Sequence, residues 1–171
     1  AVRVNWIKEK MLNYLDVRGL RQANLIIPNS RDLAKKAEEW GVEKEKITKP
    51  IYNGVDTNMF KPMSVERASE FTVAYPGRIS PEKGLHHLVK ASRGIVEKIP
   101  NVKVIIKGYP SKKSYEKQLR KLIYEYNLQQ HIRILKSSPY SDIPKYMASA
   151  DVFVLPSISE GLPLVILEAL A

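Results

Sequence analysis

The chain contains no cysteine, and this absence excludes disulfides and thiolate metal sites. Of its three histidines, His86 and His87 are adjacent and His131 is remote, so a histidine-based metal cluster is not expected. No apolar run approaches the roughly 20 residues that a membrane-spanning helix needs, and the first residues lack a secretory-signal pattern. With 171 residues, 44% of them hydrophobic, the chain can still bury a core. These features predict a globular, cytoplasmic protein.

Several motifs that handle phosphates or provide nucleophiles are also absent. The sequence has no Asp-x-Asp pair, no Gly-Lys-Ser/Thr loop, no Gly-x-Gly-x-x-Gly fingerprint and no Gly-x-Ser-x-Gly elbow. We therefore expect no bound metal at a phosphate site in this segment. Cationic side chains and helix termini would have to hold any phosphate instead.

Positive charge is in excess, because 28 Lys and Arg stand against 18 Asp and Glu, a formal net charge of +10. Such an excess is compatible with nucleic acid, anionic lipid or a polyanionic small molecule as the partner. The cations are spread along the chain and are not interleaved with aromatic residues, as they would be in a platform for single-stranded nucleic acid. Charge alone does not choose between a basic surface and a specific anion site.

From residue 71 onward, short β-rich runs alternate with amphipathic helical stretches. This alternation predicts an α/β fold, a Rossmann-like parallel sheet with helices on both faces. The predicted strands are residues 71–76, 102–107, 132–135 and 152–155. The predicted helices are residues 84–98, 114–126 and 141–149, and a fourth that starts near residue 162.

The first third of the chain repeats this pattern and is interpreted as a separate region. We expect a helix over residues 4–15, a strand over 24–27, a helix over 31–40 and a strand over 47–52. Ser30 is a suitable N-cap for the second helix, and Gly41 suits its end. We divide the chain into residues 1–60, a linker over 61–70, and residues 71–171. Because the last helix stops without a capping signal, we expect a fragment that is incomplete at both ends.

The segment Gly77-Arg78-Ile79-Ser80-Pro81-Glu82-Lys83-Gly84 follows the strand predicted over residues 71–76 and opens a helix. Ligands of open α/β sheets bind at the carboxyl ends of the strands. Gly77 permits a close backbone approach, Arg78 offers a planar fork of donors and Lys83 a mobile point charge, which together suit a diphosphate. The alternative is an ordinary turn whose Arg and Lys are solvated.

The segment Ser157-Ile158-Ser159-Glu160-Gly161-Leu162-Pro163 follows the strand predicted over residues 152–155. Pro163 suits the first position of a helix, and the amides before it could meet an anion. Glu160 would repel phosphate and is better placed against sugar hydroxyls. After the third strand, the segment 137–140 could hold a base, with Tyr140 as a stacking wall, or could simply pack on itself.

Glu168 is an isolated acid within an apolar run over residues 162–171. A carboxylate among apolar neighbours is costly unless donors satisfy it, and the paired hydroxyls of a sugar or ribose are suitable donors. An ion pair with a nearby Lys or Arg is the alternative. On one continuous helix, Glu160 and Glu168 would be separated by roughly 12 Å of rise, so they would contact different parts of an elongated ligand.

Four segments in this order resemble the family 4 retaining glycosyltransferases. They are Tyr52-Asn53-Gly54-Val55-Asp56 with Phe60-Lys61-Pro62, then Gly77 to Gly84, then Ala150-Asp151-Val152-Phe153-Val154-Leu155-Pro156-Ser157, and finally Glu160 to Ala169. Members of this family, which includes glycogen synthases and mannosyltransferases, have the GT-B fold. In that fold two Rossmann-like domains face a cleft, and the C-terminal domain holds the nucleotide sugar.

The resemblance implies a metal-independent, retaining transfer of a hexose from a nucleotide-diphosphate sugar to an acceptor hydroxyl, with no cofactor besides that substrate. Arg78, Lys83 and Glu160 are the implied catalytic residues. Arg78 and Lys83 would hold the diphosphate, Glu160 would contact the transferred sugar, and Glu168 would accept from the ribose hydroxyls. The implied donor-binding residues are Gly77, Arg78, Lys83, Glu160, Gly161, Leu162 and Glu168.

By this resemblance, residues 1–60 are the tail of an acceptor-side domain and residues 71–171 a truncated donor-binding domain. We expect this chain alone to be inactive, because catalysis needs donor and acceptor held together. The acceptor, a sugar or a lipid-linked sugar, is not identified, and peripheral membrane contact stays open. We expect no nucleic acid as a partner, although a basic nucleic-acid-binding module and a non-catalytic Rossmann-like assembly domain are the alternatives.

Overall fold

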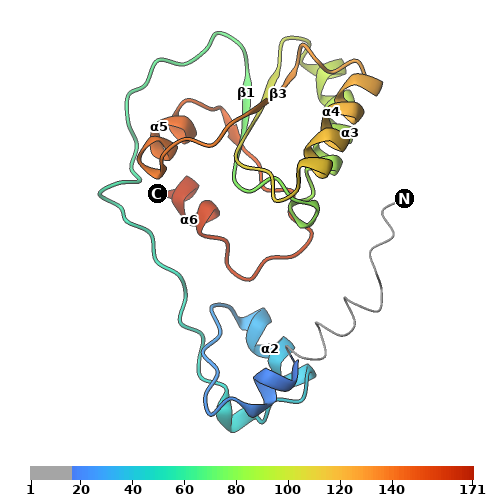
Figure 1. Cartoon of the computed structure of the whole chain (residues 1–171). Helices are drawn as coiled ribbons and strands as arrows, with labels where there is room; N and C mark the ends of the chain where they lie inside the picture. Colours follow the sequence, from blue (N-terminus) through green and yellow to red (C-terminus); the bar gives the residue numbers. More distant parts are fainter. Residues whose placement is uncertain (1–16) are drawn as a thin grey trace. The chain divides into compact units, whose positions relative to one another are not determined.

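The computed structural model describes residues 17–171, which divide into two compact units (Figure 1). Unit 1 ends at Asn53, and unit 2 comprises Gly54–Ala171. The helix predicted over residues 4–15 lies outside the described residues. We describe each unit by itself.

In unit 1, helix α2 spans Arg31–Glu39 and confirms the helix predicted at this place. Its N-cap is Ser30, whose side-chain oxygen accepts a hydrogen bond of 3.2 Å from the amide of Leu33. This bond satisfies an amide that the first turn of a helix leaves without an internal partner. The helix ends just before Gly41, as expected.

The two strands predicted in unit 1 are wrong as strands. Residues 24–27 and 47–52 contribute only one isolated parallel bridge, between Ile26 and Ile47. Apolar side chains of these segments stay exposed, with Ile27 at 56% and Ile51 at 64%. The physical reason is that, within residues 17–53, these two segments pair with no further strand, and an isolated pair of extended segments buries too little surface to form a stable ladder.

Unit 2 contains a four-stranded parallel sheet with the strand order β3-β2-β1-β4. The strands are β1 (Thr72–Pro76), β2 (Lys103–Lys107), β3 (Ile132–Leu135) and β4 (Val152–Phe153). All four strands were predicted. The ladder of β4 is shorter than the predicted range, although the amide of Val154 still donates to the carbonyl of Ala74 at 2.9 Å.

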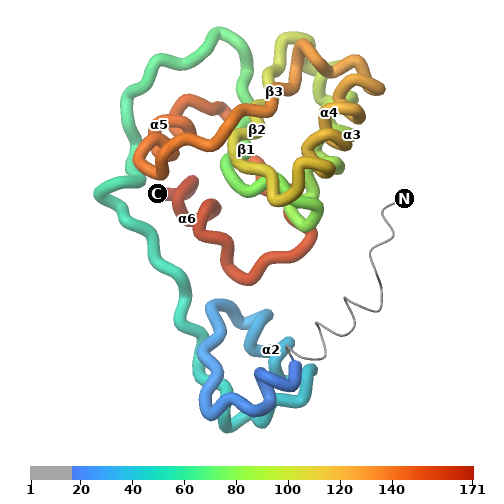
Figure 2. Tube along the Cα trace, viewed as in Figure 1, coloured from blue at the N-terminus to red at the C-terminus, as the bar shows by residue number. Residues whose placement is uncertain are grey.

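Helices lie on both faces of this sheet, as the sequence predicts (Figures 1 and 2). Helices α3 (Leu85–Lys98) and α4 (Lys113–Glu125) pack together on one face. Helices α5 (Ile143–Ala148) and α6 (Leu164–Leu170) lie on the other side, where α5 contacts both β1 and α6. Among the described residues, no helix combines the length and the apolar character that crossing a bilayer requires.

The main hydrophobic core of unit 2 lies between the sheet and the helices α3 and α4. Side chains of β2 alternate, so that Val104 and Ile106 are fully buried while the residues between them are partly exposed. From the helices, Val89 and Leu119 complete this core, each 1% exposed or less. The 3.6-residue spacing of apolar positions in α3 thus becomes one buried face.

The edge strand β4 is attached to β1 by a side chain as well as by the backbone. A carboxylate oxygen of Asp151 accepts a hydrogen bond of 2.8 Å from the amide of Thr72, and the amide of Asp151 donates to the carbonyl of Thr72 at 2.9 Å. Asp151 therefore fixes the register at which β4 joins the sheet. The loop that follows β4 is placed by this register.

Candidate functional site

The strand order of unit 2 creates a switch point between β1 and β4. The chain moves from β1 to β2 and β3 in one direction and then returns to place β4 on the other side of β1. In open parallel sheets, the loops that leave such a switch point diverge and form a crevice at the carboxyl edge. The loops concerned are residues 77–84 after β1 and residues 154–163 after β4, which carry most of the predicted site residues.

The loop after β1 is held by the backbone that follows β2. The amide of Gly77 donates to the carbonyl of Lys107 at 3.0 Å, and Ile79 and Pro110 form a parallel bridge. A Cβ atom on Gly108 would lie 1.8 Å from the carbonyl oxygen of Gly77, so only glycine fits at Gly108. The close approach of a ligand to Gly77 stays a prediction, and the glycine requirement at Gly108 was not predicted.

A second close approach joins the two loops of the switch point. Gly84 has φ +64°, and a Cβ atom there would lie 1.9 Å from the carbonyl oxygen of Pro156. Beside this contact, the amide of Ile158 donates to the carbonyl of Glu82 at 2.9 Å. The backbones of the two loops therefore lie against each other, and this packing decides which side chains meet.

Lys83 and Glu160 are the side chains that meet there. The Lys83 Nζ atom lies 2.5 Å from Glu160 Oε1, and the two side chains are only 20% and 24% exposed. Burial alone would raise the pKa of Glu160, but the hydrogen bond from Lys83 and the charges of Lys83 and Arg78 lower it below its ordinary value. Two residues that are 77 positions apart in the sequence thus form one charged pair at the sheet edge.

Arg78 lies in the same loop and is more exposed. One of its terminal nitrogens, Nη2, lies 3.3 Å from a carboxylate oxygen of Glu82, and about half of each side chain is exposed. The carbonyl of Arg78 accepts a hydrogen bond of 2.7 Å from the hydroxyl of the fully buried Tyr75, which fixes the backbone of Arg78. Burial, and secondarily the charge of Glu160, raises the pKa of Tyr75, so its hydroxyl stays protonated. The backbone of Arg78 is thus held in place by Tyr75, while its guanidinium group stays about half exposed.

The segment around Gly161 and Leu162 precedes α6 rather than beginning it. Helix α6 starts at Leu164, and Pro163 is its N-cap with ψ 121°, so the expectation of Pro163 at the first helical position is wrong. Glu160 and Glu168 consequently do not share one continuous helix, and the rise of roughly 12 Å that we expected does not apply to them. Pro163 ends an extended segment because its ring fixes φ without fixing ψ.

Glu168 lies on α6 and is half-buried, so the predicted enclosure in apolar surroundings is only partial. Its Oε1 atom accepts a hydrogen bond from the hydroxyl of Tyr140. The ring of Tyr140 packs on Phe60, with 5.6 Å between ring centroids. The donor to Glu168 is therefore a tyrosine, where the alternative interpretation expected a Lys or Arg. Sequence reasoning placed Tyr140 near the site but missed this contact, for which no local pattern exists.

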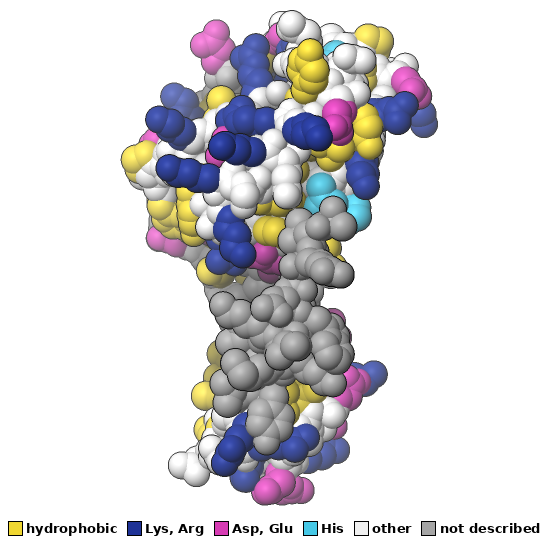
Figure 3. Space-filling view, turned by 45° about the vertical axis from the view of Figure 1, so that its right-hand side comes forward, with side chains coloured by type: hydrophobic (Ala, Val, Ile, Leu, Met, Phe, Trp, Pro, Cys, Tyr) yellow, Lys and Arg dark blue, Asp and Glu magenta, His cyan; other side chains and the backbone are white. Residues whose placement is uncertain are grey.

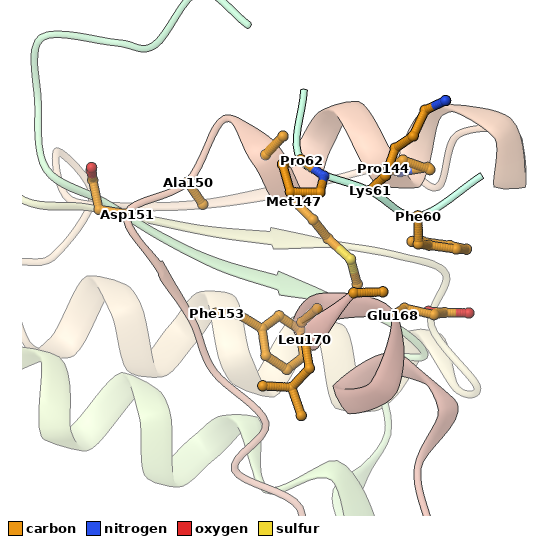
Figure 4. A pocket seen from close by; sticks show the side chains of 13 residues that line it. Phe60, Lys61, Pro62, Pro144, Met147, Ala150, Asp151, Phe153, Glu168 and Leu170 are labelled. Carbon is orange, nitrogen blue, oxygen red and sulfur yellow. The ribbon is translucent and has the colours of Figure 1, made fainter. Parts of the chain in front are cut away.

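A pocket of about 330 Å³ lies beside Glu168, between α5, β4 and α6 (Figure 4). Apolar side chains form most of its wall, among them Phe60, Met147, Phe153 and Leu170. Figure 4 shows Phe60 and Glu168 next to each other at one end of this pocket. The pocket includes Glu168 but not Arg78, Lys83 or Glu160, so it does not bring Glu168 together with the charged side chains of the switch-point edge.

Basic side chains are abundant on the surface. Figure 3 shows many Lys and Arg side chains on the visible face, with acidic and hydrophobic side chains between them. Within residues 17–171, no group of three or more His, Asp or Glu side chains is arranged to hold a metal ion. The ion pair between Lys83 and Glu160 at the switch-point edge is less exposed than the pair between Glu43 and Lys46 in unit 1.

Comparison with known proteins assigns this chain to a family. The family described as Glycosyl transferases group 1 matches residues 57–171. The match covers more than half of the chain, and we conclude that the chain belongs to this family. The fold agrees, because its structural neighbours are GT-B glycosyltransferases, which confirms the GT-B type of sheet predicted from the sequence.

Two curated relatives illustrate the similarity. The chain is 32% identical over 160 residues to the UDP-Gal:alpha-D-GlcNAc-diphosphoundecaprenol alpha-1,3-galactosyltransferase of Escherichia coli, covering 85% of the chain and 39% of the relative. It is 30% identical over 163 residues to the D-inositol 3-phosphate glycosyltransferase of Corynebacterium urealyticum, covering 86% of the chain and 38% of the relative. The chain therefore spans about two fifths of the length of these relatives.

Among solved structures, the Anabaena protein Alr3699/HepE in complex with UDP-glucose is similar with a TM-score of 0.79. The sequence identity is 28%, and the match covers 91% of this chain and 45% of that protein. The fold and the family are thus supported by independent comparisons.

Proposed function

We propose that this chain binds the donor of a glycosyltransferase that moves a hexose from a nucleotide-diphosphate sugar to an acceptor hydroxyl. The single observation that carries the proposal is the meeting of Lys83 and Glu160 at the switch point of the sheet. A cation and a carboxylate at that edge suit a ligand with a phosphate at one point and hydroxyls at another. Membership of the glycosyltransferase family supports this interpretation.

In this proposal Lys83 and Arg78 hold the diphosphate and stabilise the negative charge that builds up on it as the sugar leaves. Lys83 exchanges its bond to Glu160 for a phosphate oxygen, which frees Glu160 to accept from the hydroxyls of the transferred sugar. Glu168 accepts from the ribose hydroxyls through oxygen atoms that Tyr140 does not occupy. The amides near Gly161 and Leu162 face the sugar and the phosphate.

We further propose that the transfer retains the configuration of the sugar and does not depend on a metal. The acceptor then arrives on the face from which the nucleotide diphosphate departs, and cationic side chains replace the metal as the source of positive charge. Support for the metal independence comes from the lack of an Asp-x-Asp pair and from the two cations at the switch-point edge. The acceptor we propose is a sugar or a lipid-linked sugar, supported by the diphosphoundecaprenol-linked acceptor in the name of the Escherichia coli relative.

The nucleotide is proposed to be UDP, because the structurally similar Anabaena protein, which is more than a quarter identical, was solved with UDP-glucose. The proposal is tested by calorimetric titration of the full-length gene product with UDP, GDP and ADP. We expect UDP to bind most tightly. Arg78→Ala and Lys83→Ala should each weaken UDP binding about tenfold or more, since each removes a charge-assisted hydrogen bond.

Lys117→Ala is the matched control, because Lys117 is an exposed cation on α4 whose removal changes the net charge equally. It should leave UDP affinity unchanged. Equal weakening by all three substitutions would indicate a general effect of charge, and unchanged binding in Arg78→Ala and Lys83→Ala would overturn the assignment of the diphosphate site.

A further inference from the structure

The segment that begins unit 2 forms a turn over residues 56–60, and the ring of Phe60 at its end is buried. The Oδ1 atom of Asp56 accepts hydrogen bonds from the amides of Asn58 at 2.9 Å and Met59 at 3.3 Å. The carbonyl of Asp56 accepts from the amide of Phe60 at 2.8 Å. This turn leaves Phe60 only 2% exposed. Asp56 and Phe60 belong to a motif that the donor site described above does not use.

The buried ring of Phe60 supports Tyr140. The two rings are 5.6 Å apart at an angle of 59°, a tilted arrangement that aromatic pairs favour. Tyr140 itself is 58% exposed and begins the 3₁₀ turn Tyr140–Asp142. Without the contact to Phe60, an exposed tyrosine at this place would be free to change rotamer. The packing therefore restricts where its hydroxyl lies.

The hydroxyl of Tyr140 donates to Glu168 Oε1. This hydrogen bond, together with some burial, raises the pKa of Tyr140 to about 12. A tyrosine hydroxyl is protonated throughout the neutral pH range, so Tyr140 is a donor there with or without this shift. A carboxylate can accept about four hydrogen bonds, so the one from Tyr140 leaves Oε2 and further lone pairs for a ligand.

We propose that Tyr140, supported by Phe60, is a positioning residue that orients the carboxylate of Glu168 toward the vicinal hydroxyls of the donor's ribose. A free glutamate side chain has several rotamers, and ordering it upon binding costs affinity. A hydrogen bond already made in the unliganded protein removes part of that cost. This inference rests on the proposed function, in which Glu168 recognises the ribose.

The test compares UDP with 2′-deoxy-UDP, which lacks one of the two ribose hydroxyls. Dissociation constants are measured by calorimetry on the full-length gene product and on its variants. The unchanged protein should bind UDP about tenfold more tightly than 2′-deoxy-UDP, since a hydrogen bond to a charged group is lost in the analogue. Tyr140→Phe keeps the ring on Phe60 but removes the hydroxyl, and it should reduce this ratio to about threefold or less.

Two further variants separate positioning from a loss of folding. Tyr124→Phe removes the hydroxyl of an exposed tyrosine near the end of α4, and it should keep the tenfold ratio. Glu168→Gln should lower the ratio by itself, and adding Tyr140→Phe to it should lower the ratio no further, because Tyr140 acts through Glu168. The ratio of the dissociation constants for 2′-deoxy-UDP and UDP reports on recognition of the ribose hydroxyl. It stays the same in a variant that binds both nucleotides less tightly by the same factor.

The possible failures are distinguishable. If the unchanged protein binds no UDP, or if Glu168→Gln keeps the full ratio, the proposed role of Glu168 fails and the inference fails with it. If Glu168→Gln loses the ratio while Tyr140→Phe keeps or increases it, the donor site stands and only the role of Tyr140 is overturned.

Discussion

The two units have similar sequence patterns, yet within residues 17–171 only unit 2 forms a sheet. In unit 2, every predicted strand pairs with at least one neighbour, and fourteen buried apolar residues form one cluster. In the described part of unit 1, two strand-like segments share a single bridge and keep Ile27 and Ile51 exposed. Apolar, β-branched runs therefore become strands only where other strands and covering helices bury them.

Two glycines, one from each unit, differ in the space around them. Gly84 in unit 2 touches the carbonyl oxygen of Pro156 so closely that a methyl group cannot be accommodated. Gly19 in unit 1 has nothing within 4 Å of the place where a Cβ atom would lie. Close backbone packing at the sheet edge of unit 2 thus accompanies the candidate site, and matched substitutions in the two units test its importance.

The largest effect is expected at Gly84. Gly84→Ala should lower the free energy of unfolding by about 3 to 5 kcal/mol, because the new methyl group overlaps the carbonyl of Pro156 and the residue keeps a positive φ. Gly19→Ala lies in a helical segment with open space and should be neutral or stabilise by about 0.5 to 1 kcal/mol. Chemical denaturation measures both, and equal effects would contradict the contrast between these two positions.

A somewhat smaller effect is expected from truncating an isoleucine. Ile106 in β2 is fully buried, so Ile106→Ala should cost about 3 kcal/mol through lost burial and the cavity left behind. The matched change in unit 1, Ile27→Ala, removes a side chain that is 56% exposed and should change stability by no more than about 0.5 kcal/mol. A large loss with Ile27→Ala, measured by denaturation, would show that Ile27 is buried by something in the folded protein.

The smallest effect concerns an ion pair, and it depends on pH. Glu160→Gln should destabilise unit 2 by about 1 kcal/mol at neutral pH, because Glu160 loses its charge-assisted bond to Lys83. The folded pKa of Glu160 is lowered, so its stabilisation is present above the ordinary value of 4.5 and is lost as the pH falls through the folded pKa. The difference in unfolding midpoint between the unchanged protein and Glu160→Gln should therefore shrink in acid.

The corresponding pair in unit 1 provides the control for this pH dependence. Glu43 lies 3.2 Å from Lys46, but its side chain is 69% exposed. Exposed pairs of this kind contribute little, so Glu43→Gln should leave the unfolding midpoint unchanged at every pH. A difference between Glu160→Gln and the unchanged protein that stays constant down to strongly acidic pH would show that the charge of Glu160 is not the cause.

Much of unit 2 could be predicted from the sequence. The strand positions, the helices on both faces and the placing of Arg78 and Lys83 at a strand end follow from local periodicity and turn residues. The contact between Lys83 and Glu160 could only be anticipated in general terms, since it depends on the order of β1 and β4. The bond from Tyr140 to Glu168 was not predictable, because it joins two elements through side-chain packing on Phe60.

Hydrophobic period, capping residues and motif order in neighbouring residues were enough to predict the elements of unit 2, the helix of unit 1 and the family. They were not enough to predict which extended segments pair or which charged side chains meet, because both depend on the packed fold. Ile26 and Ile47 form a bridge without becoming a sheet, while Gly84 lies against Pro156 and brings Lys83 to Glu160. The physical reason is that these contacts depend on burial and close approach between segments far apart in the chain, which no local pattern encodes.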